Sequence, residues 1–211
     1  MTRKTCLDTH RLREEIAMTA ARLIAEDGLD YASAKRKATR QITGEDKVSG
    51  DLLPNNEEIE EEVRAYLDLF QADTHPAQLR ELRLTALTLM ERLPNYHLHL
   101  VGAVLNGTAT HHSDIHLQAF CDNSKDLAIE LLNQGVQYEV SETRHFAGRG
   151  MVETLSFLWR QHRQPQPIGV HIVLYTPSDL RNAAKLDAKK RPLRLDAAGL
   201  RGLLHDQLTP V

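Results

Sequence analysis

The sequence predicts a helical N-terminal region followed by an α/β or α+β domain. Up to residue 93, apolar residues recur every three or four positions, which is the period of a helix that buries one face. From Tyr96 onward the period falls to two, and β-branched and aromatic residues become more frequent, as in strands. We therefore expect a helical region over residues 1–93 and a domain with a β-sheet over residues 94–211.

The N-terminal helices are bounded by residue types that start or stop a helix. Asparagine, aspartate and threonine cap the first turn, proline fits the first helical position, and glycine or proline ends the last turn. The apolar stripes between these signals indicate a packed core. Four helices are predicted in this way: from Asp8 or Thr9 to Gly28, over Tyr31–Thr43 before Gly44, from Pro54 onward, and from Pro76 to Pro94.

The second half of the chain alternates predicted strands with predicted helices. Strands fit where apolar residues alternate with polar ones, and helices fit where the longer period returns. The strands are residues 96–101, 114–121, 136–141, 151–159 and 168–175, and the helices are residues 124–134, 178–186 and 196–207.

Composition limits the class of protein. The 211 residues are 41% hydrophobic, which is enough for a packed core, and no run of about 18 apolar residues occurs that would span a membrane. The N-terminus lacks the apolar stretch of a signal peptide, so we expect a cytoplasmic protein with no membrane partner. A charge of −3 lacks the basic excess of a dedicated nucleic-acid binder. Cys6 and Cys121 have no spacing typical of a disulfide framework or a zinc site.

The segment VGAVLNGTATHHSDIHL, residues 101–117, contains the candidate site. Alternation along its strand places Ile115 and Leu117 on an apolar face and Asp114 and His116 side by side on the other. Such a pair can hold one divalent cation. Gly102 follows a predicted strand, and glycine lets the backbone approach a phosphate closely.

This segment resembles the signature of the nucleotidyltransferase superfamily, which has the DNA polymerase β-like fold. The family pattern is a hydrophobic residue, G and [GS], followed by D-h-[DE], and small bacterial members commonly run G-S-x-A-R-G-x-A-x-x-x-S-D-I-D-L. The resemblance implies an α+β fold in which helices flank a mixed β-sheet. Without gaps, the matching positions are Gly102, Gly107, Ala109, Ser113, Asp114, Ile115 and Leu117.

The resemblance also implies an activity and a site. Members transfer a nucleoside monophosphate from a nucleoside triphosphate to an acceptor, with Mg²⁺ or Mn²⁺ held by acidic residues. Asp114 and His116 stand at the first two metal positions, and the family's third acid lies on the strand after the next helix, where Glu139 is the first choice. Glu153 and His171, on later strands, are the second choices for this third metal ligand. The residues expected around the triphosphate are Gly102, Ala103, Gly107, Thr108 and Ser113.

Three residues depart from the family pattern. Ala103 replaces a serine or glycine, Asn106 replaces a common arginine, and His116 replaces the second acid. A neutral imidazole offers one lone pair and no charge, so His116 cannot bridge two Mg²⁺ ions as a carboxylate does. Three readings follow: a fold that binds a nucleotide, nucleic acid or protein without transfer, transfer supported by a single softer cation, or a solvent-facing strand with no site.

Other motifs narrow the alternatives. There is no G-x-x-x-x-G-K-[ST] phosphate loop and no G-x-S-x-G elbow, and the serines nearest to histidines, Ser113 and Ser141, lack an elbow context. A hydrolase triad is therefore not predicted. His111 and His112 either line the pocket of Asp114 or belong to a plain turn. The rival to nucleotide binding is a non-catalytic regulatory or interaction module, a pseudoenzyme that binds a protein or nucleic acid through its helical half. The oligomeric state is not predicted.

Overall fold

The computed structural model describes residues 2–45, 48–160, 166–187 and 189–207, which form two compact units. The first unit comprises residues 1–78 with 108–112, and the second comprises residues 79–107 with 113–211. No helix in the described ranges is long and apolar enough to span a membrane. In chain order the helices are α1 (Thr2–Asp27), α2 (Tyr31–Thr43), α3 (Asn56–Phe70), α4 (His75–Arg92), α5 (Ala103–Asn106), α6 (Ser124–Asn133), α7 (Pro177–Asn182) and α8 (Ala197–Asp206). The strands are β1 (His99–Val101), β2 (Ile115–Phe120), β3 (Glu139–Arg144), β4 (Met151–Trp159) and β5 (Ile168–Tyr175).

The first unit is built on α1, α2 and α3, as the helical periodicity predicts. Their apolar stripes meet in one core, in which the small side chains of α1 and α2 allow close packing. The fully buried members include Ile16, Ala20, Ala34, Ile59 and Val63.

The ends of these helices are fixed by the capping residues that the sequence shows. The Asp30 carboxylate accepts hydrogen bonds from the N–H groups of Ala32 and Ser33 at the start of α2. Gly44 ends α2 in the left-handed conformation, with φ of 75°. Asn55 and Glu58 form a capping box at the start of α3.

The segment of residues 108–112 belongs to the first unit and packs on the end of α1. The Nε2–H of His112 donates to the carbonyl oxygen of Glu26, 3.1 Å away. A Cβ atom at Gly28 would lie 2.7 Å from the His112 side chain, so the glycine at this helix end is needed for the contact.

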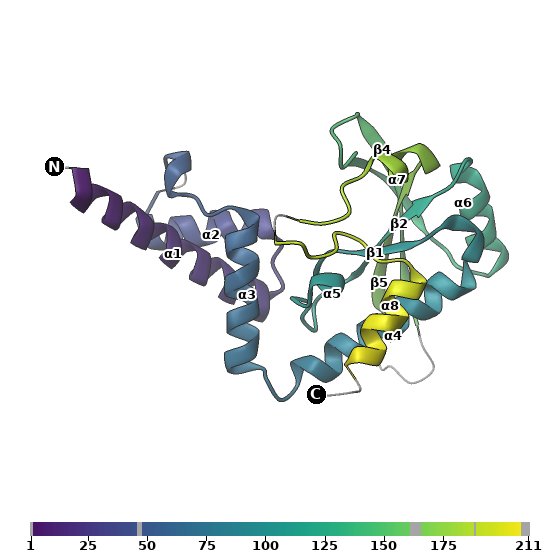
Figure 1. Cartoon of the computed structure of the whole chain (residues 1–211), viewed down its shortest axis with the longest axis horizontal. Helices are drawn as coiled ribbons and strands as arrows, with labels where there is room; N and C mark the ends of the chain where they lie inside the picture. Colours follow the sequence, from purple (N-terminus) through teal and green to yellow (C-terminus); the bar gives the residue numbers. More distant parts are fainter. Residues whose placement is uncertain (1, 46–47, 161–165, 188, 208–211) are drawn as a thin grey trace. The chain divides into compact units, whose positions relative to one another are not determined.

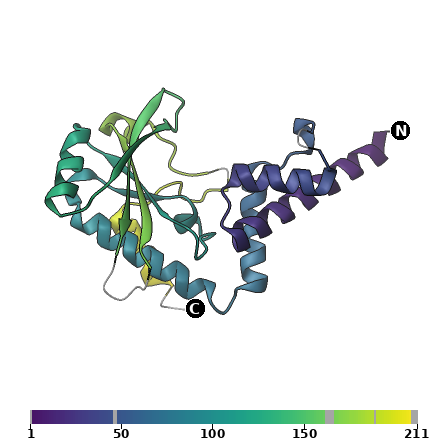
Figure 2. The same cartoon turned by 180° about the vertical axis from the view of Figure 1, so that it is seen from behind.

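The second unit contains a five-stranded mixed sheet in the order β1-β2-β5-β4-β3 (Figures 1 and 2). β2 and β5 are parallel, and the other neighbours are antiparallel. β5 therefore lies directly beside β2, although more than forty residues separate the two strands along the chain. This pairing decides which side chains meet at the candidate site.

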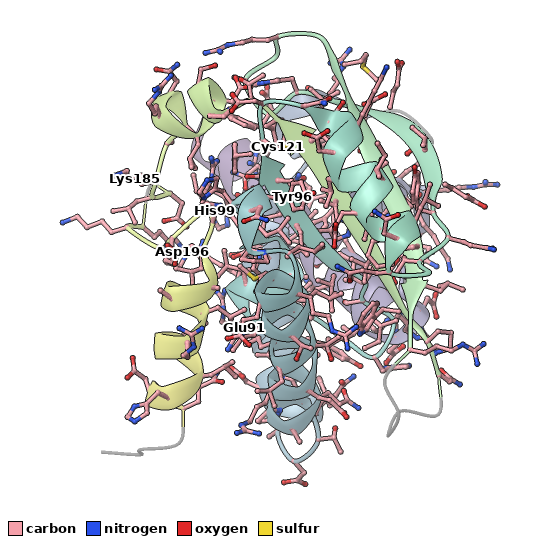
Figure 3. All side chains as sticks on the ribbon, turned by 90° about the vertical axis from the view of Figure 1, so that its right-hand side faces the viewer. Glu91, Tyr96, His99, Cys121, Lys185 and Asp196 are labelled. Atoms are coloured by element: carbon pink, nitrogen blue, oxygen red, sulfur yellow. The ribbon has the colours of Figure 1, made fainter. Side chains whose placement is uncertain are left out.

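The two faces of the sheet differ. Ile115, Leu117 and Ala119 of β2 are fully buried on one face, together with Val170 and Ile172 of β5. Helices α4, α6 and α8 lie on one side of the sheet in Figure 3. The other face carries Asp114 and His116, as the alternation along β2 predicts.

The observed elements confirm the predicted α+β fold, a mixed sheet flanked by helices behind a helical N-terminal region. α2, β4 and β5 have the predicted bounds. β3 covers Glu139–Arg144 rather than residues 136–141. β1 is shorter than predicted because Pro94–Tyr96 forms a 3-10 turn and His97 is left-handed, with φ of 44°. Cys121 is a free thiol, and the side chain of Cys6 lies outside the described part of the chain.

Candidate functional site

One residue from each strand contributes to a row across the polar face of the sheet. Directly paired residues of neighbouring strands point to the same face. The register pairs Val101 with His116, His116 with His171, His171 with Ser156, and Ser156 with Glu139. The sheet thus brings His116 beside His171, which the sequence offered as a second choice for the third metal ligand. One strand further on, Ser156 lies beside His171, and nothing in the residue pattern indicated its role.

His171 is hydrogen-bonded through both ring nitrogens. Its Nε2 lies 3.0 Å from Oδ2 of Asp114, and its Nδ1 lies 2.9 Å from Oγ of Ser156. An ionised carboxylate can only accept, so Nε2–H is the donor to Asp114. In the neutral ring Nδ1 is then the acceptor, and the Ser156 hydroxyl donates to it. The two neighbours fix one tautomer of His171.

Asp114 is ionised and accessible. The hydrogen bond from His171 lowers the pKa of this carboxyl, and burial works in the opposite direction. The charges of His171 and His116 and the backbone N–H of Gly169 lower the pKa further. The Asp114 side chain is 46% exposed, so a cation or a polar ligand can reach it.

Gly169 makes room for the Asp114 side chain. A Cβ atom at residue 169 would lie 2.3 Å from Oδ1 of Asp114, which is closer than real atoms approach. The φ of Gly169 is not in the left-handed region, so the requirement is for space. A glycine inside a strand pattern is the signal that could have indicated this close approach from the sequence.

His116 stacks on His171, with ring centroids 4.9 Å apart and an angle of 19° between the planes. His116 is exposed to solvent, but partial desolvation by the surrounding side chains lowers its pKa, the charge of His171 lowers it further, and Asp114 opposes both. The neutral imidazole is therefore favoured at neutral pH, and a neutral ring has a lone pair to offer to a metal ion.

The glycine bend lies beside this strand. Gly102 follows β1 with φ of 72° and ψ of −153°, and a Cβ atom there would lie 3.9 Å from Cβ of His116. The bend leads into α5, in which the carbonyl oxygens of Val104 and Leu105 accept hydrogen bonds from the buried guanidinium of Arg83 at 2.9 and 2.8 Å. α4 thus holds the bend in place.

The other residues expected around the triphosphate are distributed between the two units. Ala103 begins α5 and Gly107 ends it, with φ of 89°. Ser113 precedes Asp114 in the second unit and is partly exposed. Thr108 belongs to the first unit, where it is buried and hydrogen-bonded to Tyr31.

A groove of about 850 Å³ runs over the part of the polar row formed by His171, Ser156 and Glu139, and its lining includes neither His116 nor Gly102. Its polar lining includes Asp114, His171, Ser156, Glu139 and Arg160. Neither His111 nor His112 is among the lining residues. Leu158, which is 68% exposed, supplies an apolar wall opposite Gly169.

The predicted acids do not converge on Asp114. Glu139 lines the same groove, but β5 and β4 stand between its strand and β2. Glu153 lies two residues from Leu155 on β4, so both point to the apolar face, which is opposite to the face of Asp114 and Ser156. The place on β5 directly beside His116 is taken by His171.

This set of donors does not fit two Mg²⁺ ions. In the described ranges no three His, Cys, Asp or Glu side chains are grouped to hold a metal ion. Oδ2 of Asp114 already accepts from His171, and both nitrogens of His171 are engaged. Asp114 and His116 remain as ligands for at most one cation, and their carboxylate and imidazole suit Mn²⁺ or Zn²⁺ better than Mg²⁺.

Comparison with known proteins gives distant structural similarity. No family model matches the chain, and no curated protein matches it. A solved structure of the RNA terminal uridylyl transferase Cid1 is 17% identical over 50% of this chain, with a TM-score of 0.35. A second structure, of Cid1 poly(U) polymerase, is 18% identical over 61% of this chain, with a TM-score of 0.32. A structure of a cytoplasmic RNA terminal U-transferase is 18% identical over 61%, with a TM-score of 0.29. The chain spans about a third of the length of these proteins, covering 33%, 34% and 32% of them, and similarity at this level does not establish a shared family.

Proposed function

We propose that the protein binds a nucleoside triphosphate beside Asp114, on the side of the Gly102 bend, as a nucleotidyltransferase-like protein that lacks two-metal transfer. The triphosphate lies against the Gly102 bend. Asp114 and His116 face the phosphate groups and the cation bound to them. The acceptor that an active relative would use, a protein or a nucleic acid, is not part of this proposal.

One observation carries the proposal. The Gly102 bend and the Asp114–His116 pair lie at the same end of the neighbouring strands β1 and β2. A Cβ atom placed on Gly102 would lie 3.9 Å from Cβ of His116. This is the juxtaposition that the motif resemblance requires, because the bend positions phosphate and the acidic strand faces it.

The chemistry of the donors argues against transfer. In two-metal catalysis the ions neutralise the triphosphate and lower the pKa of the attacking hydroxyl, which takes at least two well-placed carboxylates. Here the groups beside Asp114 are His116 and His171. A single cation on Asp114 and His116 would assist binding by neutralising phosphate charge without activating an acceptor.

Calorimetric titration tests the proposal. We expect saturable binding of ATP or another nucleoside triphosphate in the presence of Mn²⁺. Asp114→Ala should weaken it by about tenfold or more, equal to about 1.4 kcal/mol. Glu153→Ala is the matched control, since it removes a carboxylate from the opposite face of the same sheet and should leave the affinity unchanged. Equal affinity in wild type and Asp114→Ala would contradict the site.

A second function is favoured by a different observation. In the first unit a groove of about 380 Å³ between α1 and α3 is lined by exposed apolar side chains. Met18, Leu69 and Phe70 are 57%, 73% and 65% exposed. Apolar patches of this kind are typical of protein interaction surfaces. If no nucleoside triphosphate binds at all, the non-catalytic interaction module becomes the better account.

A further inference from the structure

Ser156, His171 and Asp114 form a continuous hydrogen-bonded chain, of which the proposed nucleotide site uses only Asp114. The three residues come from β4, from β5 and from the position just before β2. The contacts are 2.9 Å from Ser156 Oγ to His171 Nδ1 and 3.0 Å from His171 Nε2 to Asp114 Oδ2. This is the order of groups that activates a serine hydroxyl, and such a set is recognised by geometry and not by sequence position.

We propose that Ser156 is a nucleophile and that the groove hydrolyses carboxylic esters with a small apolar acyl group. This inference goes beyond nucleotide binding and does not depend on it. Ser156 and His171 are the catalytic residues, because they touch the reacting atoms, and Asp114 is a positioning residue that acts through His171.

The direction of the proton follows from the fixed tautomer. Asp114 holds Nε2–H of His171, so Nδ1 is the free base that faces the Ser156 hydroxyl. Ser156 Oγ attacks the carbonyl carbon, and its proton passes to Nδ1. The resulting imidazolium is stabilised by the ionised Asp114, which keeps its own charge.

The remaining steps balance. Collapse of the tetrahedral adduct breaks the carbon–oxygen bond to the leaving alcohol, which takes the proton from Nδ1. The acyl group stays on Ser156 Oγ. A water molecule then attacks the acyl carbon and gives its proton to Nδ1. Release of the carboxylic acid returns that proton to Ser156, and the net reaction is ester plus water to acid plus alcohol.

The groove has the surroundings that this reaction needs. Ser156 and His171 are partly exposed and line the groove of about 850 Å³. The exposed side chain of Leu158 lies two residues from Ser156 on the same face of β4 and provides an apolar surface for an acyl group. Arg160 is the one cationic side chain among the described residues that line this groove, and a guanidinium is a donor that can stabilise an oxyanion.

The experiment is labelling with a fluorophosphonate, with EDTA present and no nucleotide added. The serine oxygen displaces fluoride from phosphorus, so intact mass and peptide mapping locate the modified residue. We expect one label on Ser156 and hydrolysis of 4-nitrophenyl acetate. Ser156→Ala and His171→Ala should lose about a thousandfold or more in kcat. Asp114→Asn should lower kcat with little change in KM when the rate is divided by the amount of protein that fluorophosphonate can label at Ser156, a normalisation that removes the effect of unfolded protein.

Ser141→Ala is the control, because Ser141 lies on the neighbouring strand β3, on the same face of the sheet, without a histidine partner in the register. In this variant, fluorophosphonate should label Ser156 and the ester should be hydrolysed, both at the wild-type rate. Wild-type protein that stays unlabelled, or that is labelled at another residue, overturns the proposal whether or not any variant folds. Because the assay contains EDTA and no nucleotide, neither a cation nor a triphosphate is bound during labelling. The outcome is therefore independent of the titration with ATP.

Discussion

The position of the Asp114 carboxylate depends on one missing atom. Gly169 has no Cβ, and the carboxylate occupies the space that a Cβ would take, while His171 holds Oδ2 from the other side. Both contacts come from β5. The residue that the motif identifies is thus placed by a strand that lies far outside the motif.

Gly169→Ala tests this placement. The new Cβ would meet Oδ1 of Asp114 at 2.3 Å, so the carboxylate must turn away at a cost of about 1–3 kcal/mol for overpacking. We expect weaker Mn²⁺ and triphosphate binding by calorimetry. Gly202→Ala in α8 is the control, since a Cβ there meets nothing within 4 Å and alanine favours a helix. Unchanged binding in Gly169→Ala would show that Asp114 is not a ligand.

His116→Asp restores the acid that the family pattern has. Two carboxylates on one face of β2 attract Mg²⁺ more strongly than a carboxylate and an imidazole do, so the Mg²⁺ affinity should rise by about tenfold or more, equal to about 1.4 kcal/mol. Transfer of a nucleotide to any acceptor by this variant would mean that the scaffold is intact. A variant that binds neither Mg²⁺ nor a triphosphate would count against the whole pocket.

At the scale of elements, the start of α3 is tied to α1. Glu58 accepts from the N–H of Asn55 in the capping box, and the Arg13 guanidinium donates to the same carboxylate at 2.7 Å. The hydrogen bond from Arg13 lowers the pKa of Glu58, and burial opposes it. One side chain therefore joins a helix cap to an ion pair.

Removing Glu58 should lower stability in a way that depends on pH. Because the pKa is depressed from 4.5, the carboxylate stabilises the fold above pH 4.5 and stops doing so as pH falls through the lower folded value. Glu58→Ala should cost about 1 kcal/mol at pH 7, with the gap to wild type narrowing in acid, by thermal unfolding. Glu57→Ala, in the same first turn, should cost less. An equal gap at pH 3 and pH 7 would refute the ionic origin.

Elements with local signals could be predicted, and those with tertiary causes could not. α2 lies where the sequence places it because Asp30 and Gly44 act within one turn of its ends. β1 is shortened by the left-handed His97, a conformation uncommon for a residue other than glycine and invisible in the residue pattern. β3 starts at Glu139, whereas the residue pattern alone predicts a start at residue 136, in the segment that follows α6.

At the scale of the whole molecule, strand order decides the composition of the site. Alternation within one strand correctly placed Asp114 and His116 on one face. It could not say that β5 pairs with β2, because that parallel pairing is set by packing over a long stretch of chain. For this reason His171 takes the position beside His116, and Glu139 lies on the far edge strand. Ser156 reaches His171 through a different pairing, that of β4 with β5. The boundary at residue 93 and the roles of the site residues stay predictions.

Nucleotide binding and the reactivity of Ser156 share Asp114, which gives a prediction for the molecule as a whole. A cation on Asp114 competes with the His171 Nε2–H for the carboxylate and so weakens the support of His171. Mn²⁺ should therefore slow fluorophosphonate labelling of Ser156, with the rate followed by intact mass. His116→Ala, which removes the second cation ligand, should lessen the slowing. Labelling that proceeds equally with and without Mn²⁺ would mean that the cation does not bind at Asp114.

The most direct measurement is a crystal structure of the protein with a nonhydrolysable triphosphate and Mn²⁺. We expect phosphate density against the Gly102 bend and anomalous Mn²⁺ density beside Asp114 and His116. Triphosphate density elsewhere on the chain, or a clear site at Asp114 that stays without ligand density at saturating concentrations, would contradict this expectation.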